Sequence, residues 1–292
     1  SAPVNGCPVG GPAVAQQIAQ IMGTEAGDAA RMVATVKCQG TTERCKPKFQ
    51  YQGIPNCLSA SLVSDGNKAC HYACLGLGTC ARVCPFGAIT IDERMKIAVV
   101  DPQLCTGCTQ CVAVCPKKVL SMQPADAPVQ LLCRAADEGK LVSDNCKVGC
   151  VGCELCYRAC KFGAITMRDH LPVIDRGKCV GCMMCAEVCP TSAIWGDFDN
   201  RREAVIDAGQ CIGCGLCKRA CQFEAIAGSP KQPHAVTEAC TGCGQCVAKC
   251  PKKCIAMRVR RHPRDEFAKV GTTVIEAAVP QASLQQTDQA QQ

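Results

Sequence analysis

The sequence has few of the side chains with which a protein of this length usually builds its core. Aromatic residues make up 3% of the 292 residues, with a single tryptophan, and there are only four histidines. Aromatic side chains normally supply much of the buried apolar area. Something besides side-chain packing must therefore hold much of the fold together, and bound metal is the leading candidate.

Three common features are also missing. No segment reaches the roughly 18 consecutive apolar residues of a membrane-spanning helix. The opening residues, Ser1 to Cys7, have neither the basic region nor the apolar core of a signal peptide. No Gly-x-Gly-x-x-Gly loop for a dinucleotide occurs. We expect no catalytic site in this chain.

Cysteine, by contrast, is abundant, with 31 residues. Disulfide scaffolds with so much cysteine are short secreted chains, and an odd number of thiols cannot pair completely. Most of the cysteines fall into quartets. Five quartets share the spacing Cys-x2-Cys-x2-Cys-x3-Cys: Cys105, Cys108, Cys111 and Cys115; Cys150, Cys153, Cys156 and Cys160; Cys179, Cys182, Cys185 and Cys189; Cys211, Cys214, Cys217 and Cys221; and Cys240, Cys243, Cys246 and Cys250. A sixth, altered quartet comprises Cys70, Cys74, Cys80 and Cys84.

The spacing indicates iron–sulfur clusters rather than zinc. Zinc modules use two separated pairs of ligands, commonly with histidine. Here three cysteines at i, i+3 and i+6 are followed by a fourth at i+10, which is the pattern of bacterial ferredoxins with two [4Fe–4S] clusters. All five unaltered quartets also have glycine before the second cysteine, where a loop around a cluster needs positive φ and close backbone approach.

In that pattern the fourth cysteine binds the other cluster of the pair, which predicts six crossed ligand sets. The sets are Cys70, Cys74, Cys80 and Cys115; Cys84, Cys105, Cys108 and Cys111; Cys150, Cys153, Cys156 and Cys189; Cys160, Cys179, Cys182 and Cys185; Cys211, Cys214, Cys217 and Cys250; and Cys221, Cys240, Cys243 and Cys246. In the altered quartet, Leu77 takes the place of a cysteine and Cys70 is the expected substitute. The sequence therefore predicts six [4Fe–4S] clusters.

Short apolar β-like runs lie on either side of the quartets, which suits a small antiparallel strand pair beside each cluster loop. We therefore expect an α+β fold of tandem two-cluster ferredoxin modules with short β pairs and small helices. The predicted boundaries are a lead-in at 1–69 with one short helix at 12–22, modules at 70–125, 126–200 and 201–262, and a polar tail at 263–292, expected to be disordered.

The formal net charge of +7 at pH 7 could suggest a nucleic-acid partner. Ligation changes this charge, because 24 thiolates and six cluster cores of about +2 each bring the total to roughly −5. Binding to nucleic acid is therefore not expected.

Three further motifs are absent from general ferredoxins: Asn5 to Gly11, Val36 to Gly40, and Ala69 to Cys80. With them, residues 5–195 resemble the B subunit of the Rnf electron-transport complex. The resemblance implies an electron-transfer subunit at the cytoplasmic face of a bacterial membrane. It would relay electrons between soluble ferredoxin and other subunits of a ferredoxin:NAD oxidoreductase that moves sodium ions or protons. The alternative is a polyferredoxin subunit of a soluble hydrogenase or dehydrogenase.

Two basic pairs, Lys117–Lys118 and Lys252–Lys253, follow a Cys-Pro. Such pairs are usually solvated surface. The alternative is a landing site for an acidic ferredoxin, where complementary charge would raise the association rate.

Seven cysteines lie outside the quartets: Cys7, Cys38, Cys45, Cys57, Cys133, Cys146 and Cys254. The spacing from Cys57 through Cys70 to Cys74 is the same as that from Cys133 through Cys146 to Cys150, so these segments look duplicated. Cys38, Cys57, Cys133 and Cys146 could form a further site, but buried inert thiols are the preferred interpretation. Cys254 is expected to act as a small hydrophobic residue.

Cys7 is followed by proline, as fourth cluster cysteines often are. In the resembling family, a membrane helix and a cysteine-rich segment precede this point. The resemblance therefore implies a membrane-anchored protein in which Cys7 completes a cluster with upstream residues.

Overall fold

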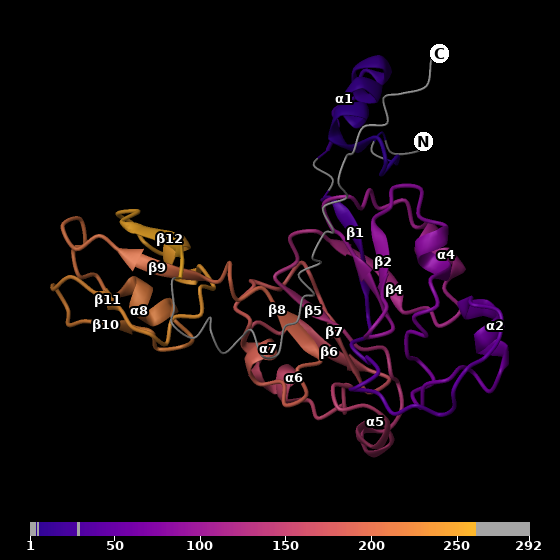
Figure 1. Ribbon diagram of the computed structural model, residues 1–292. Helices are drawn as coiled ribbons and strands as arrows, with labels where there is room; N and C mark the ends of the chain where they lie inside the picture. Colours follow the sequence, from indigo (N-terminus) through magenta and orange to yellow (C-terminus); the bar gives the residue numbers. More distant parts are fainter. Residues whose placement is uncertain (1–3, 5, 28–29, 261–292) are drawn as a thin grey trace, which may run out of the picture.

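The computed structural model describes residue 4, residues 6–27 and residues 30–260 (Figure 1). The tail predicted at 263–292 lies outside the described residues. Three modules follow one another along the chain, and the third, in orange and yellow, lies to one side of the first two in Figure 1.

Each module contains two antiparallel strand pairs, an outer pair from its two ends and an inner hairpin. The outer pairs are β1 (Met32–Val36) with β4 (Leu120–Pro124), β5 (Val129–Leu131) with β8 (Ile194–Gly196), and β9 (Arg202–Ile206) with β12 (Ile255–Val259). The inner hairpins are β2 (Ile89–Asp92) with β3 (Ile97–Val100), β6 (Ile165–Arg168) with β7 (Leu171–Ile174), and β10 (Ile226–Ala227) with β11 (Ala235–Val236). The short antiparallel pairs expected from the sequence are confirmed.

The first module begins earlier than the sequence indicated. Strand β1 belongs to the segment assigned to the lead-in, yet it pairs along its whole length with β4, from Met32 opposite Pro124 to Val36 opposite Leu120. The outer pair joins the two ends of a module, so the first module starts at β1 and not at Cys70.

Six very short helices carry the third cysteine of each quartet. They are α3 (Thr79–Arg82), α4 (Gln110–Val114), α6 (Leu155–Ala159), α7 (Met184–Glu187), α8 (Leu216–Ala220) and α9 (Gln245–Ala248). The cysteine is a buried residue in every one of them. Helices of one turn are not stable alone, so these depend on what the cysteines bind.

Three other helices lie outside the cluster loops: α1 (Gly11–Met22), α2 (Cys57–Leu62) and α5 (Gly139–Asn145). Helix α1 is the helix predicted at 12–22, and Gly23 ends it with a φ of 64°. Its buried residues are Ala15 and Ala19, whereas Ile21 is 84% exposed. No described helix is long and apolar enough to cross a membrane.

The core of each module consists of small aliphatic side chains and cysteines. The third module, for example, buries Ala204, Ile226 and Ile255 together with Cys217 and Cys246. The largest side chains that are fully buried among the described residues are only Val119 and Val129. Isolated two-stranded sheets around so small a core are marginally stable, so the modules need a bound group to fill their centres.

The first two modules share a backbone contact. Cys45 and Cys146 form an isolated antiparallel bridge, in which the Lys46 N–H donates to the Asn145 carbonyl at 2.9 Å. On the other side of the bridge the Lys147 N–H donates to the Arg44 carbonyl at 2.8 Å. The lead-in segment therefore connects the two modules.

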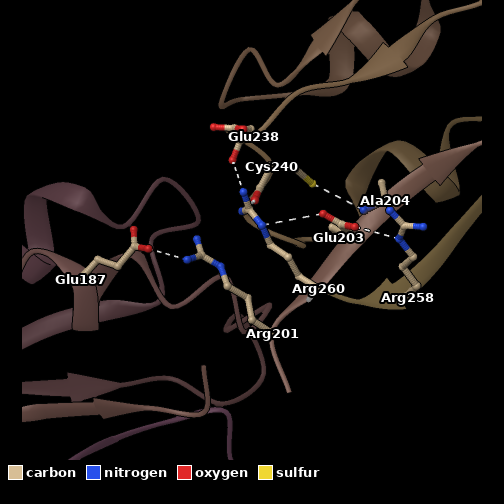
Figure 2. A network of polar contacts seen from close by, with 8 residues as sticks. All are labelled: Glu187, Arg201, Glu203, Ala204, Glu238, Cys240, Arg258 and Arg260. Carbon is tan, nitrogen blue, oxygen red and sulfur yellow. Dashed lines mark hydrogen bonds and ion pairs between the residues drawn. The ribbon is translucent and has the colours of Figure 1, made fainter. Parts of the chain in front are cut away.

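Charged side chains hold the third module against the second and close its own ends (Figure 2). Arg201, between the modules, pairs with Glu187 of α7. Arg260, at the end of β12, donates to the carbonyls of Glu238 and Cys240 at 2.8 and 3.0 Å and lies 3.7 Å from a Glu203 carboxylate oxygen. Because the Cys240 carbonyl belongs to a cluster loop, this network connects the outer strand pair to the loop.

Candidate iron–sulfur sites

The five unaltered cluster loops share one backbone conformation. The glycine before the second cysteine has a φ between 65° and 77° in every loop, at Gly107, Gly152, Gly181, Gly213 and Gly242. A side chain there would also meet neighbouring backbone, since a Cβ on Gly107 would lie 2.6 Å from the Met32 carbonyl oxygen. The expectation that these positions require glycine for positive φ and close approach is confirmed.

The residue after the second cysteine is also left-handed and caps the short helix that follows. Thr109, Glu154 and Met183 occupy this position with φ near 60°, at 66°, 59° and 61°. Two consecutive turns of this kind wrap the loop around a hollow that the cysteines face.

Cavities of similar size lie inside three of the cluster loops, one in each module. Their volumes are about 310, 340 and 320 Å³ in modules one, two and three. Each is lined by three cysteines of one quartet and the fourth cysteine of its partner: Cys105, Cys108, Cys111 and Cys84; Cys179, Cys182, Cys185 and Cys160; and Cys211, Cys214, Cys217 and Cys250. Cys254 also lines the third cavity. The structure thus brings together three of the crossed sets around cavities.

The cysteines of two more crossed sets lie close enough to raise one another's pKa. Burial raises the pKa of Cys246 to about 11, and the thiolates of Cys240, Cys243 and Cys221 add to the rise. Burial likewise raises the pKa of Cys156, with contributions from Cys189 and Cys153. Burial raises the pKa of Cys150 to about 11, with contributions from Cys133, Cys189 and Cys156, so Cys150 lies close to the other members of this second set.

The sixth set differs from the one expected. Burial raises the pKa of Cys80 to about 12, with contributions from Cys74, Cys57 and Cys115. Cys57 begins helix α2, and its backbone N–H donates to the Thr79 hydroxyl, next to Cys80, at 2.8 Å. The structure therefore places Cys57 with Cys74, Cys80 and Cys115, in the position expected for Cys70.

Cys70 instead lines a separate cavity of about 350 Å³ between the first two modules. Four other cysteines line the same cavity: Cys38, Cys45, Cys133 and Cys146. The sequence suggested Cys57 as a companion of Cys38, Cys133 and Cys146, whereas the cavity has Cys45 and Cys70 in its place. Cys45 carried no signal in the sequence, because it belongs to neither the quartets nor the duplicated spacing.

The sulfur atoms of the cluster sets accept backbone hydrogen bonds. In each case an alanine N–H donates to a cysteine Sγ: Ala34 to Cys105 at 3.3 Å, Ala164 to Cys160 at 3.4 Å, Ala225 to Cys221 at 3.3 Å and Ala204 to Cys240 at 3.5 Å. Such bonds stabilise thiolate and tune the potential of a bound cluster. Thiol-only donor sets around cavities and N–H donors to sulfur both fit [4Fe–4S] clusters.

The same residues do not fit a single metal ion. In the described part of the chain, no group of three or more His, Cys, Asp or Glu side chains is arranged to hold one. The cysteines surround cavities instead of converging on a point, so the donor sets suit a group with several iron atoms.

The remaining candidate residues have mixed outcomes. Lys117 is buried and its Nζ lies 2.6 Å from an Asp65 carboxylate oxygen, so it is not free to bind a partner, whereas Lys118 is exposed. Cys254 is buried, as a small hydrophobic residue would be, with its Sγ 3.5 Å from that of Cys250. Cys7 is exposed.

Known families match the modules directly. Models described as 4Fe-4S dicluster domains match residues 68–119, 149–193, 178–225 and 204–257. The iron–sulfur assignment and the ferredoxin-type fold are therefore confirmed. The matches do not fix the number of clusters.

Three relatives are similar over most of the modules. The chain is 43% identical over 199 residues to the B subunit of the Na⁺-translocating ferredoxin:NAD⁺ oxidoreductase complex of Acetobacterium woodii. It is 43% identical over 193 residues to the B subunit of the ion-translocating oxidoreductase complex of Methanosarcina acetivorans. It is 40% identical over 176 residues to the B subunit of the proton-translocating ferredoxin:NAD⁺ oxidoreductase complex of Clostridium ljungdahlii.

These matches cover 68%, 66% and 60% of this chain, and 60%, 73% and 62% of the three relatives in the same order. The chain thus spans less than two thirds of the Acetobacterium and Clostridium proteins but nearly three quarters of the Methanosarcina protein. From this extent of identity, the chain belongs to the B-subunit family of ion-translocating oxidoreductase complexes, the Rnf family that its motifs resemble.

Proposed function

We propose that this chain is the electron-transfer subunit of a membrane-bound Rnf-type complex and relays electrons between soluble ferredoxin and the other subunits. The complex would couple electron transfer from ferredoxin to NAD to the movement of sodium ions or protons. The observation that carries the proposal is the set of ferredoxin-type cysteine loops, repeated in three modules that contact one another. Bound [4Fe–4S] clusters supply one-electron redox chemistry, and this chain's residues hold and insulate them.

The six clusters of the proposal use the crossed sets with one change of ligand. Cys57 takes the place of Cys70 beside Cys74, Cys80 and Cys115, supported by its hydrogen bond to Thr79 and its influence on the Cys80 thiol. The other five sets keep the ligands expected from the sequence.

Contacts between modules two and three support an electron path through both. Cys243 of the third module helps to raise the pKa of Cys182 in the second, after burial and the cysteines of its own set. The Lys161 ammonium donates to the Gln222 carbonyl at 2.6 Å and lies 5.1 Å from the centre of the Phe223 ring. Lys161 and Gln222 each follow the fourth cysteine of a quartet, so the contact joins two cluster loops.

The partner subunits are part of the proposal, supported by the complexes for which the three relatives are named. The position at the cytoplasmic face of the membrane is proposed from the resemblance of the sequence motifs alone. The same names favour this role over that of a subunit in a soluble hydrogenase or dehydrogenase.

Deleting this chain from its source cell tests the proposal. Washed membranes should lose ferredoxin-dependent NAD reduction and regain it when the chain is restored. Restoration with Cys182→Ser, which lacks one ligand of a central set, should fail or be strongly reduced. Membranes that keep full activity without the chain would contradict the proposal.

A further inference from the structure

Five cysteines outside the proposed six ligand sets line one cavity between modules one and two. The cavity volume is about 350 Å³, compared with about 310 to 340 Å³ for the three cluster cavities described above. Its cysteines are Cys38, Cys45, Cys70, Cys133 and Cys146. Inert thiols do not require five cysteines from two modules to line one cavity.

The cysteines enter the cavity from equivalent places in the two modules. Cys38 lies two residues after β1, and Cys133 lies two residues after β5. Lys37 and Leu132 lie between the strand and the cysteine, and each extends the hydrogen bonding of its outer strand pair. The Lys37 N–H donates to the Val119 carbonyl at 2.6 Å, and the Leu132 N–H donates to the Ala193 carbonyl at 2.8 Å. Each module therefore directs one cysteine into the cavity from the end of its outer pair.

A second equivalent pair comes from the cluster loops. Cys70 and Cys146 each lie four residues before the first ligand of a loop, Cys74 in one module and Cys150 in the other. Two cysteines from each module thus face one space across the interface, and Cys45, bridged to Cys146, is the fifth.

The sulfur atoms in this cavity have the same kind of donors as those of the cluster sets. Cys38 Sγ accepts from the N–H groups of Gly40 and Cys74, both at 3.4 Å. Cys133 Sγ accepts from the Cys150 N–H at 3.3 Å. Backbone donors aimed at sulfur stabilise thiolate, which is the form that binds iron.

A buried cation lies beside the same cysteines. Lys68 is 5% exposed, and its Nζ donates to the carbonyls of Gly40 and Lys96 at 2.6 and 3.0 Å. None of the ion pairs among the described residues involves Lys68. A buried ammonium without a counter-ion is costly, and an anionic cluster in the neighbouring cavity would supply the missing negative charge.

We propose that this cavity holds a seventh iron–sulfur cluster, of the [4Fe–4S] type, ligated by Cys38, Cys70, Cys133 and one of Cys45 and Cys146. The proposal adds a site to the six of the proposed function and rests on that function only for the iron–sulfur chemistry of the chain. The four ligands lose their thiol protons when the cluster binds.

Cys45 and Cys146 lie opposite each other in the isolated antiparallel bridge, and both line the cavity. One of these two cysteines is enough to complete a set of four ligands with Cys38, Cys70 and Cys133.

The position of the site gives it a role in the electron path. Two of the three N–H groups that donate to its sulfurs belong to Cys74 and Cys150, which are ligands of clusters in module one and module two. The seventh cluster would therefore lie directly between those two clusters and connect the modules.

Iron and sulfide counting on the full chain, purified without oxygen and checked by native mass spectrometry, tests the proposal. We expect about 28 iron atoms per chain, against about 24 for six clusters. Cys57→Ser, Cys70→Ser and Cys133→Ser should each remove about four iron atoms, because each removes one ligand of a four-iron cluster.

Double variants separate the sites. Cys70→Ser with Cys133→Ser should lose about four iron atoms in total, since both serve one cluster, whereas Cys57→Ser with Cys133→Ser should lose about eight. Val142→Ala, which alters the wall of the same cavity without removing a ligand, should lose none.

The outcomes also distinguish failure of the seventh site from failure of the proposed function, which rests on the other six clusters. If Cys133→Ser keeps the full iron content and the wild type holds about 24 iron atoms, the seventh site is absent while the six remain. If the wild type holds zinc that Cys133→Ser releases, the cavity binds zinc and not iron, and the proposal of a seventh cluster is wrong. A wild type far below 24 would contradict the proposed function itself.

Discussion

At the scale of single residues, the glycine before the second cysteine is the most constrained position of each loop. Gly242 has a φ of 73°, and a Cβ there would run into the Arg202 carbonyl oxygen. We expect Gly242→Ala to lower the free energy of unfolding by at least about 1–2 kcal/mol for the left-handed backbone, and further for the displaced carbonyl. Urea unfolding without oxygen, followed by cluster absorbance, measures it.

Gly244 provides the matched control for that change. Its φ is 74°, but no atom lies within 4 Å of a Cβ placed there, and Thr109, Glu154 and Met183 occupy the equivalent position with side chains. Gly244→Ala should therefore cost only about 1–2 kcal/mol. Equal losses for the two variants would show that close approach at Gly242 contributes nothing.

The residue scale also shows what the sequence could and could not predict. The ligands of the five unaltered quartets have fixed spacing, and the structure groups them as that spacing indicated. Cys57 carries no such signal, because it lies 17 positions before Cys74 and reaches the set through the start of α2 and its bond to Thr79. Cys70, at a plausible spacing, faces the neighbouring module, which only the tertiary structure reveals.

At the scale of elements, the outer strand pair and the cluster loop of the third module depend on Arg260. Its guanidinium satisfies the carbonyls of Glu238 and Cys240, and the side chain is only 11% exposed (Figure 2). Arg260→Met should lower the free energy of unfolding by about 1–3 kcal/mol, because the carbonyl of the buried Cys240 loses its donor. The clusters held by this module should also become less stable to chelators.

Arg258, on the same strand, is the control. It pairs with the same carboxylate at 2.8 Å, but its side chain is 67% exposed. Arg258→Met should cost less than about 1 kcal/mol, as exposed ion pairs usually do. If the two variants unfold at the same urea concentration, the Arg260 network is not what holds the loop to the strands.

The elements themselves were only partly predictable. Strands of two to five residues beside each quartet follow from short apolar runs, and the inner hairpins are local. The pairing of β1 with β4 is not local, since Met32 and Pro124 lie 92 positions apart and the intervening chain holds two cluster loops. For that reason the first module was expected to begin at Cys70.

At the scale of the whole molecule, the three modules form a chain of cluster sites linked by contacts between ligand loops. The link between modules two and three passes through Lys161 and Gln222, and the link between modules one and two passes through the cavity that contains Cys38 and Cys133. No large apolar core joins the modules in the described part of the chain, so the bound clusters are at once the redox groups and the main structural support.

Transfer from reduced ferredoxin to the oxidised chain, followed by stopped-flow absorbance without oxygen, tests this role most directly. We expect rapid bleaching of the cluster absorbance that corresponds to several electrons per chain, up to about seven if every proposed cluster is reduced. The Cys182→Ser chain should accept fewer. A chain that takes up no electrons from ferredoxin, or that is colourless and contains zinc, would contradict the assignment of this protein as a multi-cluster electron carrier.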